Sequence, residues 1–196
     1  FQPIRSLATL TAAQPALLHS LGIRMVIVHG AGPQLSAWTR RMGREPELVA
    51  GRRVTDAETL ETVKMVCAGA VSTDLCAALR SHGLKPAGLT GVDGGLLDAS
   101  RRPPVEVRDD EGNVRLVDFG FVGDLHGADP SLLETLLAGG FTPVVASIAG
   151  DDHGAVFNVN SDTVAVELAL ALRAEKLVFL LGAPGLLRDP ADPGSL

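Results

Sequence analysis

The sequence has few aromatic residues: it contains no tyrosine and one tryptophan, and aromatics make up 4% of its 196 residues. Apolar residues nevertheless make up 46% of the chain and are chiefly alanine, leucine and valine. This composition is typical of helices packed on a parallel sheet. The length and apolar content suffice for the core of one domain.

No block of like charge occurs, and the basic residues are scattered in a chain of formal net charge -6. Binding to a phosphate backbone needs a basic patch, so nucleic acid is excluded as a partner. No signal-peptide pattern and no apolar run long enough to span a bilayer is evident, which predicts a cytoplasmic protein without membrane contact. The chain begins with Phe1, and residues 189–196 resemble a loop, so we expect both ends to be incomplete.

Cysteine is also scarce, with only Cys67 and Cys76 in the chain. Nine residues apart, these two side chains would face different sides of one continuous helix. Two buried free thiols are therefore favoured over a disulfide or a metal pair, and no metal site is predicted.

The hydrophobic pattern alternates between strands and helices. Short apolar runs at residues 25–28, 142–147 and 177–181 predict buried, mainly parallel strands, and 87–91 predicts another short strand. Helices are expected over residues 7–21, 35–42, 55–68, 72–82, 129–138 and 162–173. This order predicts an α/β three-layer sandwich with a mainly parallel central sheet covered by helices.

Turn and capping signals add detail to this fold. Residues 105–108 and 114–117 flank an acidic, glycine-containing turn, which predicts a small β-hairpin. Thr55 and Glu58 have the spacing of a capping box with Thr55 as the N-cap. Asp129, followed by proline, is expected to cap the next helix.

A glycine loop, Gly30-Ala31-Gly32, lies between a predicted strand and a predicted helix. Backbone N–H groups and the helix N-terminus would suit a phosphate or a carboxylate there, although a tight turn without a ligand would give the same pattern. The loop lacks the third glycine of a dinucleotide-binding fingerprint, and Pro33 removes an N–H. No Gly-Lys-Ser/Thr follows the loop, which excludes a Walker A motif.

Four further residues are candidates for a site. Arg53 could clamp a carboxylate with its planar guanidinium, or it could be a solvated surface arginine. Asn158 and Asn160 would point the same way in an extended segment. Asp162 stands where a helix begins, so helix capping alone would also explain it.

The order of several motifs resembles the acetylglutamate kinases of the amino-acid kinase family. The matching segments are His29-Gly30-Ala31-Gly32-Pro33-Gln34, Gly51-Arg52-Arg53-Val54-Thr55-Asp56, Gly88-Leu89-Thr90-Gly91-Val92-Asp93-Gly94, Asp118-Phe119-Gly120-Phe121-Val122-Gly123 and Asn158-Val159-Asn160-Ser161-Asp162. The resemblance runs from about residue 17 to residue 189. It implies an enzyme that transfers the γ-phosphoryl group of ATP, with Mg²⁺, to the side-chain carboxylate of N-acetyl-L-glutamate in arginine biosynthesis.

The resemblance also implies roles for individual residues. The glycine loop and an arginine would hold the acylated amino acid, and Asp162 would organise two phosphoryl-stabilising lysines. The substrate-binding residues carried over are Gly30, Ala31, Gly32, Arg53 and Asn158, with Asn160 in support. Leu181 and Gly182 would lie on the nucleotide side. We also expect a homo-oligomer.

Several departures from the family pattern leave alternatives open. Both family lysines fall outside residues 1–196, so we expect one incomplete domain: the acceptor-binding N-terminal part, with most of the nucleotide-binding part missing. Ala31 replaces a glycine and would be strained at positive φ. Ser72-Thr73 stands where the family has Asn-Lys, and Leu181-Gly182 where it has polar residues. The alternatives are a kinase for carrier-protein-linked aminoadipate or glutamate, and a non-catalytic homologue that binds an amino acid.

Overall fold

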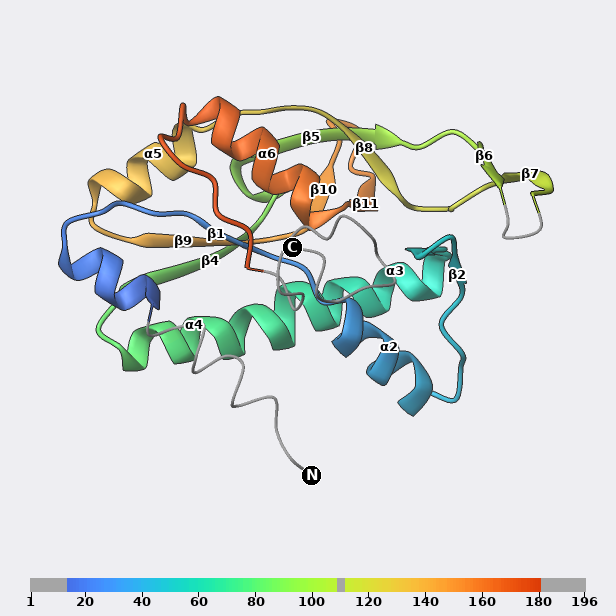
Figure 1. The fold of residues 1–196 in the computed structure, drawn as a ribbon, viewed down its shortest axis with the longest axis horizontal. Helices are drawn as coiled ribbons and strands as arrows, with labels where there is room; N and C mark the ends of the chain where they lie inside the picture. Colours follow the sequence, from blue (N-terminus) through green and yellow to red (C-terminus); the bar gives the residue numbers. More distant parts are fainter. Residues whose placement is uncertain (1–13, 109–111, 181–196) are drawn as a thin grey trace.

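The computed structural model describes residues 14–108 and 112–180. Its central sheet is parallel, and strand β9 (Thr142–Ala146) lies between β1 (Ile27–His29) and β4 (Pro86–Thr90). Ile27 and Gly88 both pair with Val144 from opposite sides. The prediction that residues 25–28 and 142–147 form neighbouring parallel strands is confirmed, because β1 and β9 lie side by side in this sheet (Figure 1).

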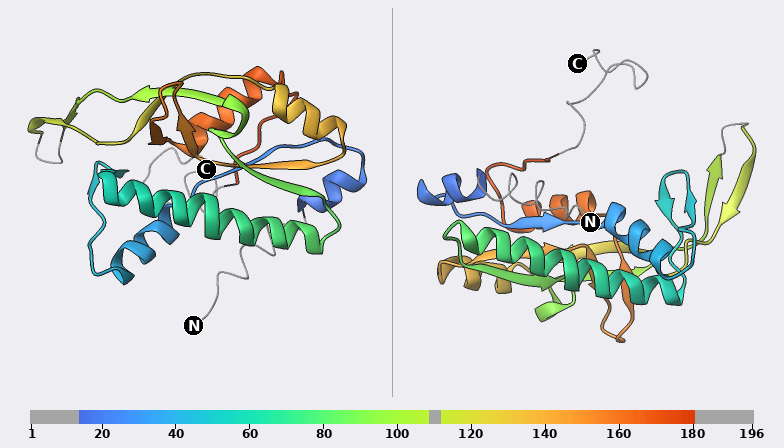
Figure 2. Two further views of the ribbon diagram at one scale, coloured as in Figure 1. Left: turned by 180° about the vertical axis from the view of Figure 1, so that it is seen from behind. Right: turned by 90° about the horizontal axis from the view of Figure 1, so that it is seen from below.

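Helices cover both faces of this sheet, which confirms the three-layer α/β class (Figures 1 and 2). On one face, Val145 packs with side chains from α5 (Ser131–Ala138) and α6 (Ser161–Ala171). On the other face, Val144 packs with the long helix described next. All five residues of β9 are buried, because successive side chains point to opposite covered faces.

The two helices expected at 55–68 and 72–82 are one continuous helix of 25 residues, Ala57–Ser81. It consists of α3 (Ala57–Val63), a π-helical segment η1 (Lys64–Val71) and α4 (Ser72–Ser81). The wider π turns bridge the stretch between the two predicted helices, where Gly69 does not break the helix.

By length and composition alone this helix is long and apolar enough to cross a membrane, a test that a core helix also passes. The helix nevertheless packs on the domain. Val63 and Cys67 contact Ala146 and Ile148, and Leu79 contacts Val144. It therefore acts here as a core helix.

A second sheet was not predicted. It runs in the order β11 (Val156–Asn158), β10 (Ile148–Gly150), β5 (Leu97–Arg101) and β8 (Gly123–Ala128). Only the β10–β5 pair is parallel. None of the strands predicted for the parallel sheet belongs to this mostly antiparallel second sheet.

Two hairpins complete the described strands. The expected hairpin pairs β6 (Val105–Arg108) with β7 (Val114–Val117), and residues 109–111 of its turn lie outside the described ranges. The other pairs β2 (Leu48–Val49) with β3 (Arg52–Arg53) and carries one candidate site residue.

Several helix ends differ from prediction. The N-cap of α3 is Asp56, whose Oδ1 accepts a 2.7 Å hydrogen bond from Thr59 N, so the assignment of Thr55 was wrong. Helix α2 (Gly32–Arg41) begins directly in the glycine loop. Asp129 accepts a 2.9 Å bond from Ser131 N, and the N-cap position of α5 is Pro130.

At the two ends of the described chain, prediction and structure differ further. Residues 14–20 are helical, and the rest of the helix expected at 7–21 lies partly outside the described residues. Residues 177–180 form no strand, and their side chains are exposed. The predicted strand at 177–181 is therefore wrong for its described part, because these residues pair with no strand in the described chain.

Candidate functional site

The glycine loop lies at the carboxyl ends of the parallel strands, between β1 and α2. A Cβ on Gly30 would come within 3.1 Å of Ser161 Oγ and 3.8 Å of Ser147 Oγ. The loop therefore lies against the end of β9 and against the first residue of α6. Two helix N-termini, which favour anions, meet near this loop.

Ala31 is accommodated without strain. It stands at the N-cap position of α2 with φ -147° and ψ 25°, so its φ is negative and a side chain is tolerated. It is buried against Leu35 and Ile148, and it has no side-chain oxygen with which to cap the helix. Like the family's glycine, Ala31 therefore offers no side-chain acceptor to the first N–H groups of α2.

Arg53 reaches the glycine loop from the β2–β3 hairpin. Its Nη2 donates to Gly32 O at 3.2 Å and to Ser36 Oγ at 2.8 Å. Burial lowers the pKa of Arg53, and the nearby charge of Arg40 lowers this pKa further. Within the described ranges no acidic side chain pairs with Arg53, so its half-buried charge is available to an anion.

Asn158, at the end of β11, is linked to the same region through Thr55. Asn158 Nδ2 donates to Thr55 Oγ1 at 3.1 Å. Thr55 follows Arg53 by two residues and is fully buried. Arg53 thus contacts Gly32 and Ser36, and Asn158 contacts Thr55, which lies two residues after Arg53 in the sequence.

Asn160 and Asp162 both lie at the start of α6, but only Asn160 caps the helix. Asn160 is the N-cap: its Oδ1 accepts from Asp162 N at 2.8 Å and from Thr163 N at 3.0 Å. Asp162 lies exposed in the first turn. Its carboxylate is therefore not the N-cap, and capping does not explain it.

His29, the last residue of β1, has an unusual environment. Burial lowers the pKa of His29, so the ring is neutral near neutral pH, and Nδ1–H donates to Gly30 O at 3.2 Å. Its Nε2 is buried and makes no hydrogen bond within residues 14–108 and 112–180. His29 therefore stabilises the loop backbone.

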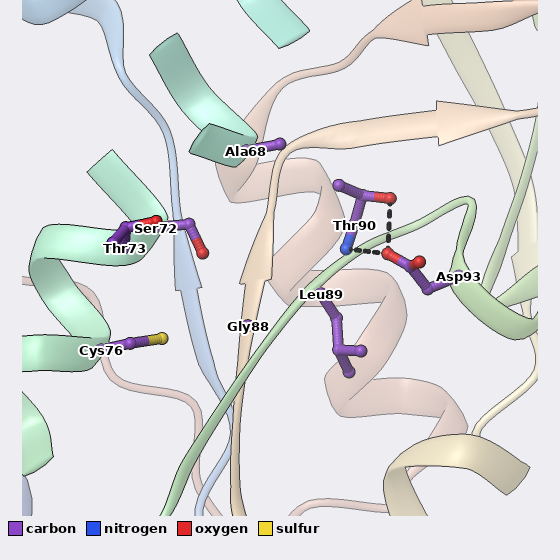
Figure 3. Close-up of a pocket in the computed structure, with 8 residues that line it drawn as sticks. All are labelled: Ala68, Ser72, Thr73, Cys76, Gly88, Leu89, Thr90 and Asp93. Carbon is purple, nitrogen blue, oxygen red and sulfur yellow. Dashed lines mark hydrogen bonds between the residues drawn. The ribbon is translucent and has the colours of Figure 1, made fainter. Parts of the chain in front are cut away.

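A cavity of about 360 Å³ lies elsewhere, between the long helix and the outer strand β4 (Figure 3). Ser72 and Thr73, which replace the family's Asn-Lys, line it, as does Asp93. Asp93 Oδ2 accepts from the backbone N and the hydroxyl of Thr90, at 2.6 and 2.8 Å. No predicted site residue lines this cavity.

Sequence reasoning missed Ser36 and misassigned Thr55. Ser36 lies one helical turn after Gly32, at the i, i+4 spacing that places two residues on one helix face, so the signal was present. Thr55 carried a stronger competing signal, the capping-box spacing. The nucleotide-side candidates Leu181 and Gly182 lie outside the described residues.

Comparison with known families agrees with this fold. The model of the amino acid kinase family matches residues 6–194. The chain belongs to the amino acid kinase family.

Within this family, the curated relatives that the chain resembles include acetylglutamate kinases. The chain is 48% identical over 186 residues to an acetylglutamate kinase of Myxococcus xanthus, covering 93% of the chain and 60% of that relative. It is 50% identical over 171 residues to an acetylglutamate kinase of Methanopyrus kandleri, covering 87% of the chain and 67% of that relative. The chain thus spans about 60% of the length of the first of these relatives.

A solved structure shares the fold. N-acetylglutamate synthase from Neisseria gonorrhoeae, in complex with coenzyme A and N-acetyl-glutamate, superimposes with a TM-score of 0.73 at 30% identity. The match covers 93% of the chain and 40% of the synthase.

Proposed function

We propose that this chain is the acceptor-binding part of an acetylglutamate kinase. The whole enzyme transfers the γ-phosphoryl group of ATP to the side-chain carboxylate of N-acetyl-L-glutamate, giving ADP and N-acetylglutamyl 5-phosphate for arginine biosynthesis. The curated relatives support the substrate and the reaction. The observation that carries the proposal is the half-buried charge of Arg53, held against the glycine loop without an acidic partner in the described chain.

The resemblance implies a role for each of these residues, and their geometry supports the following proposal. Arg53 binds the α-carboxylate of the acylated amino acid, because a guanidinium matches a carboxylate with two parallel hydrogen bonds. Gly30, Ala31 and Gly32 allow the substrate to approach the backbone near the start of α2. Asn158 contributes its side-chain amide from the other side of the site, and Asn160 supports it by fixing the start of α6.

Phosphoryl transfer to a carboxylate requires positioning and charge neutralisation from these residues, and no proton transfer. The attacking side-chain carboxylate is ionised near neutral pH, so no general base is needed. Phosphoryl transfer depends on in-line positioning and on neutralisation of charge on the transferring group. In the proposal, Asp162 holds the two family lysines, whose ammonium groups would repel each other without a nearby carboxylate.

ATP and Mg²⁺ are the cofactors of this proposal. The part of the chain that the structure describes contains no group of three or more histidine, cysteine, aspartate or glutamate side chains arranged for a metal. Because Mg²⁺ is usually bound through substrate phosphates together with one or two carboxylates, the proposal assigns it to the nucleotide phosphates. We further propose a cytoplasmic enzyme that forms a homo-oligomer.

A non-catalytic role for this domain is the second candidate, because the same fold forms 40% of a protein named for a different reaction, N-acetylglutamate synthase. Fold similarity alone does not establish phosphoryl transfer. A coupled ADP-release assay on the full-length protein separates the two, with N-acetyl-L-glutamate, glutamate and aspartate as acceptors. We expect release with N-acetyl-L-glutamate far above that with the other two. Binding of N-acetyl-L-glutamate without ADP release would favour the non-catalytic role.

A further inference from the structure

Thr55 is a fully buried polar side chain beside the proposed site. The capping role suggested by its sequence belongs to Asp56, so its hydroxyl needs another explanation. A buried hydroxyl without a partner is costly, and among residues 14–108 and 112–180 the partner of Thr55 Oγ1 is Asn158 Nδ2 at 3.1 Å. These two residues are 103 positions apart in the sequence.

The backbone holds both residues beside the same segment. Phe121 N donates to Thr55 O at 2.7 Å, and Asn158 N donates to Phe121 O at 2.9 Å. Thr55 also bridges to Gly120, whose φ is +73°. A Cβ on Gly120 would lie only 2.3 Å from Thr55 O, so glycine is needed for this close approach. The backbone contacts among Thr55, the Gly120–Phe121 segment and Asn158 therefore fix the position of the Thr55 hydroxyl.

We propose that Thr55 is a positioning residue that fixes the side-chain amide of Asn158 for the acylated amino acid. A terminal amide rotates over a broad range unless a hydrogen bond fixes it. With Nδ2 held by Thr55, the orientation of the amide is set, and Oδ1 makes no hydrogen bond within the described chain. Thr55 thus affects substrate binding through Asn158. The expected effect on substrate binding rests on the proposed function.

The substitution Thr55→Val in the full-length protein removes the hydroxyl and keeps the shape of the side chain. We expect it to raise the KM for N-acetyl-L-glutamate about tenfold, the effect of one well-placed hydrogen bond, while Thr55→Ser restores the wild-type value. Thr62→Val is the matched control. Thr62 is also buried, but its hydroxyl bonds Glu58 O within its own helix. A wild-type KM for Thr55→Val, or equal defects in the valine and serine variants, would overturn the inference.

A double-mutant cycle separates positioning from general destabilisation. In an Asn158→Ala background, Thr55→Val should raise KM no further, because the hydroxyl then has no amide to hold. An equal rise in both backgrounds would refute positioning. If Thr55→Val fails to fold, Thr55→Cys replaces it, because sulfur is a weak acceptor and should give the same rise in KM. A wild-type KM for the cysteine variant would count against the inference.

An NMR measurement does not depend on the enzymatic activity. The side-chain amide signals of Asn158 are identified by their loss in Asn158→Ala, and their hydrogen exchange is then followed in Thr55→Val. We expect faster exchange in that variant. Faster exchange in a protein that does not phosphorylate N-acetyl-L-glutamate would reject the proposed function and keep the contact. Unchanged exchange would reject the positioning role whatever the activity.

Discussion

Arg53 Nη2 and Ser36 Oγ are joined by a 2.8 Å hydrogen bond that ties the β2–β3 hairpin to the first turns of α2. A second bond from the same nitrogen reaches Gly32 O at 3.2 Å. The guanidinium is therefore oriented before any ligand arrives, which reduces the entropy lost on binding.

Replacing Arg53 with lysine should weaken binding of N-acetyl-L-glutamate by about 1.5–3 kcal/mol, the scale of a charge-assisted hydrogen bond. A lysine keeps the charge but cannot hold Ser36 and Gly32 while presenting a planar fork to a carboxylate. Calorimetry on the full-length protein measures the change in Kd. An unchanged Kd would mean that Arg53 is a surface arginine without a substrate role.

Replacing Ser36 with alanine should weaken the same binding by about 1 kcal/mol, because Arg53 loses a neutral hydrogen-bond partner. Ser81→Ala serves as the control. Ser81 is exposed at the far end of the long helix, where its hydroxyl bonds Ala78 O. If the two variants bind N-acetyl-L-glutamate equally well, the Ser36 contact does not help to orient Arg53.

For Asp162→Asn we expect a nearly unchanged melting temperature, because Asn160 is the N-cap of α6. The kcat of the full-length enzyme should fall by roughly 10²-fold or more, a typical loss when electrostatic preorganisation is removed. Asn160→Ala should instead destabilise the fold by about 1 kcal/mol through loss of the cap. A near-normal kcat in folded Asp162→Asn would remove Asp162 from the catalytic machinery.

The acid limb of stability should depend on Asp56. Hydrogen bonds from Thr59, followed by the ion pair with Arg44, lower the pKa of Asp56 from 3.8 to about 2. Because the folded-state pKa is depressed, the stabilisation is present above about pH 4 and is lost as pH falls towards 2. Thermal melts of Asp56→Asn should therefore show a flatter decline over this window than wild type. Equal slopes for the two proteins would contradict this assignment.

Gly120→Ala should be strongly destabilising. Its φ of +73° disfavours a side chain, at a cost of about 1–2 kcal/mol, and the clash with Thr55 O adds to this cost. Gly127→Ala is a suitable control, because φ there is not positive and nothing lies within 4 Å of an added Cβ. Denaturant melts compare the two, and similar free energies of unfolding would argue against the close approach at Gly120.

The parts of the fold that depend on local pattern were predictable. The apolar runs of β1 and β9 marked strands covered on both faces, and the helix pattern of α6 located that element to within two residues. The strands β5 and β8 were missed because both contain charged residues, β8 also contains glycine, and their structure depends on pairing with each other. Tertiary pairing decided those segments, and local propensity could not reveal it.

In the candidate site, too, the features with a local sequence pattern were predictable and the long-range contacts were not. The glycine loop and Arg53 could be identified from the sequence. Closely spaced glycines between a strand and a helix indicate a loop that a ligand can approach, and an arginine indicates a group that can bind a carboxylate. The contact between Thr55 and Asn158 could not be identified in this way, because it joins residues 103 positions apart. A threonine before an acidic residue also satisfies the capping pattern, so the local signal pointed to the wrong role.

That sequence separation has a consequence for synthesis on the ribosome. Thr55 is translated 103 residues before the asparagine that its hydroxyl will bind. At about 5–20 residues per second, the nascent chain carries the hydroxyl for roughly 5–20 seconds before its partner has been made. The contact between Thr55 and Asn158 can therefore form only after β11 has emerged from the ribosome. Strand β1, which leads into the glycine loop, likewise waits for its partner β9, more than 110 residues further along the chain.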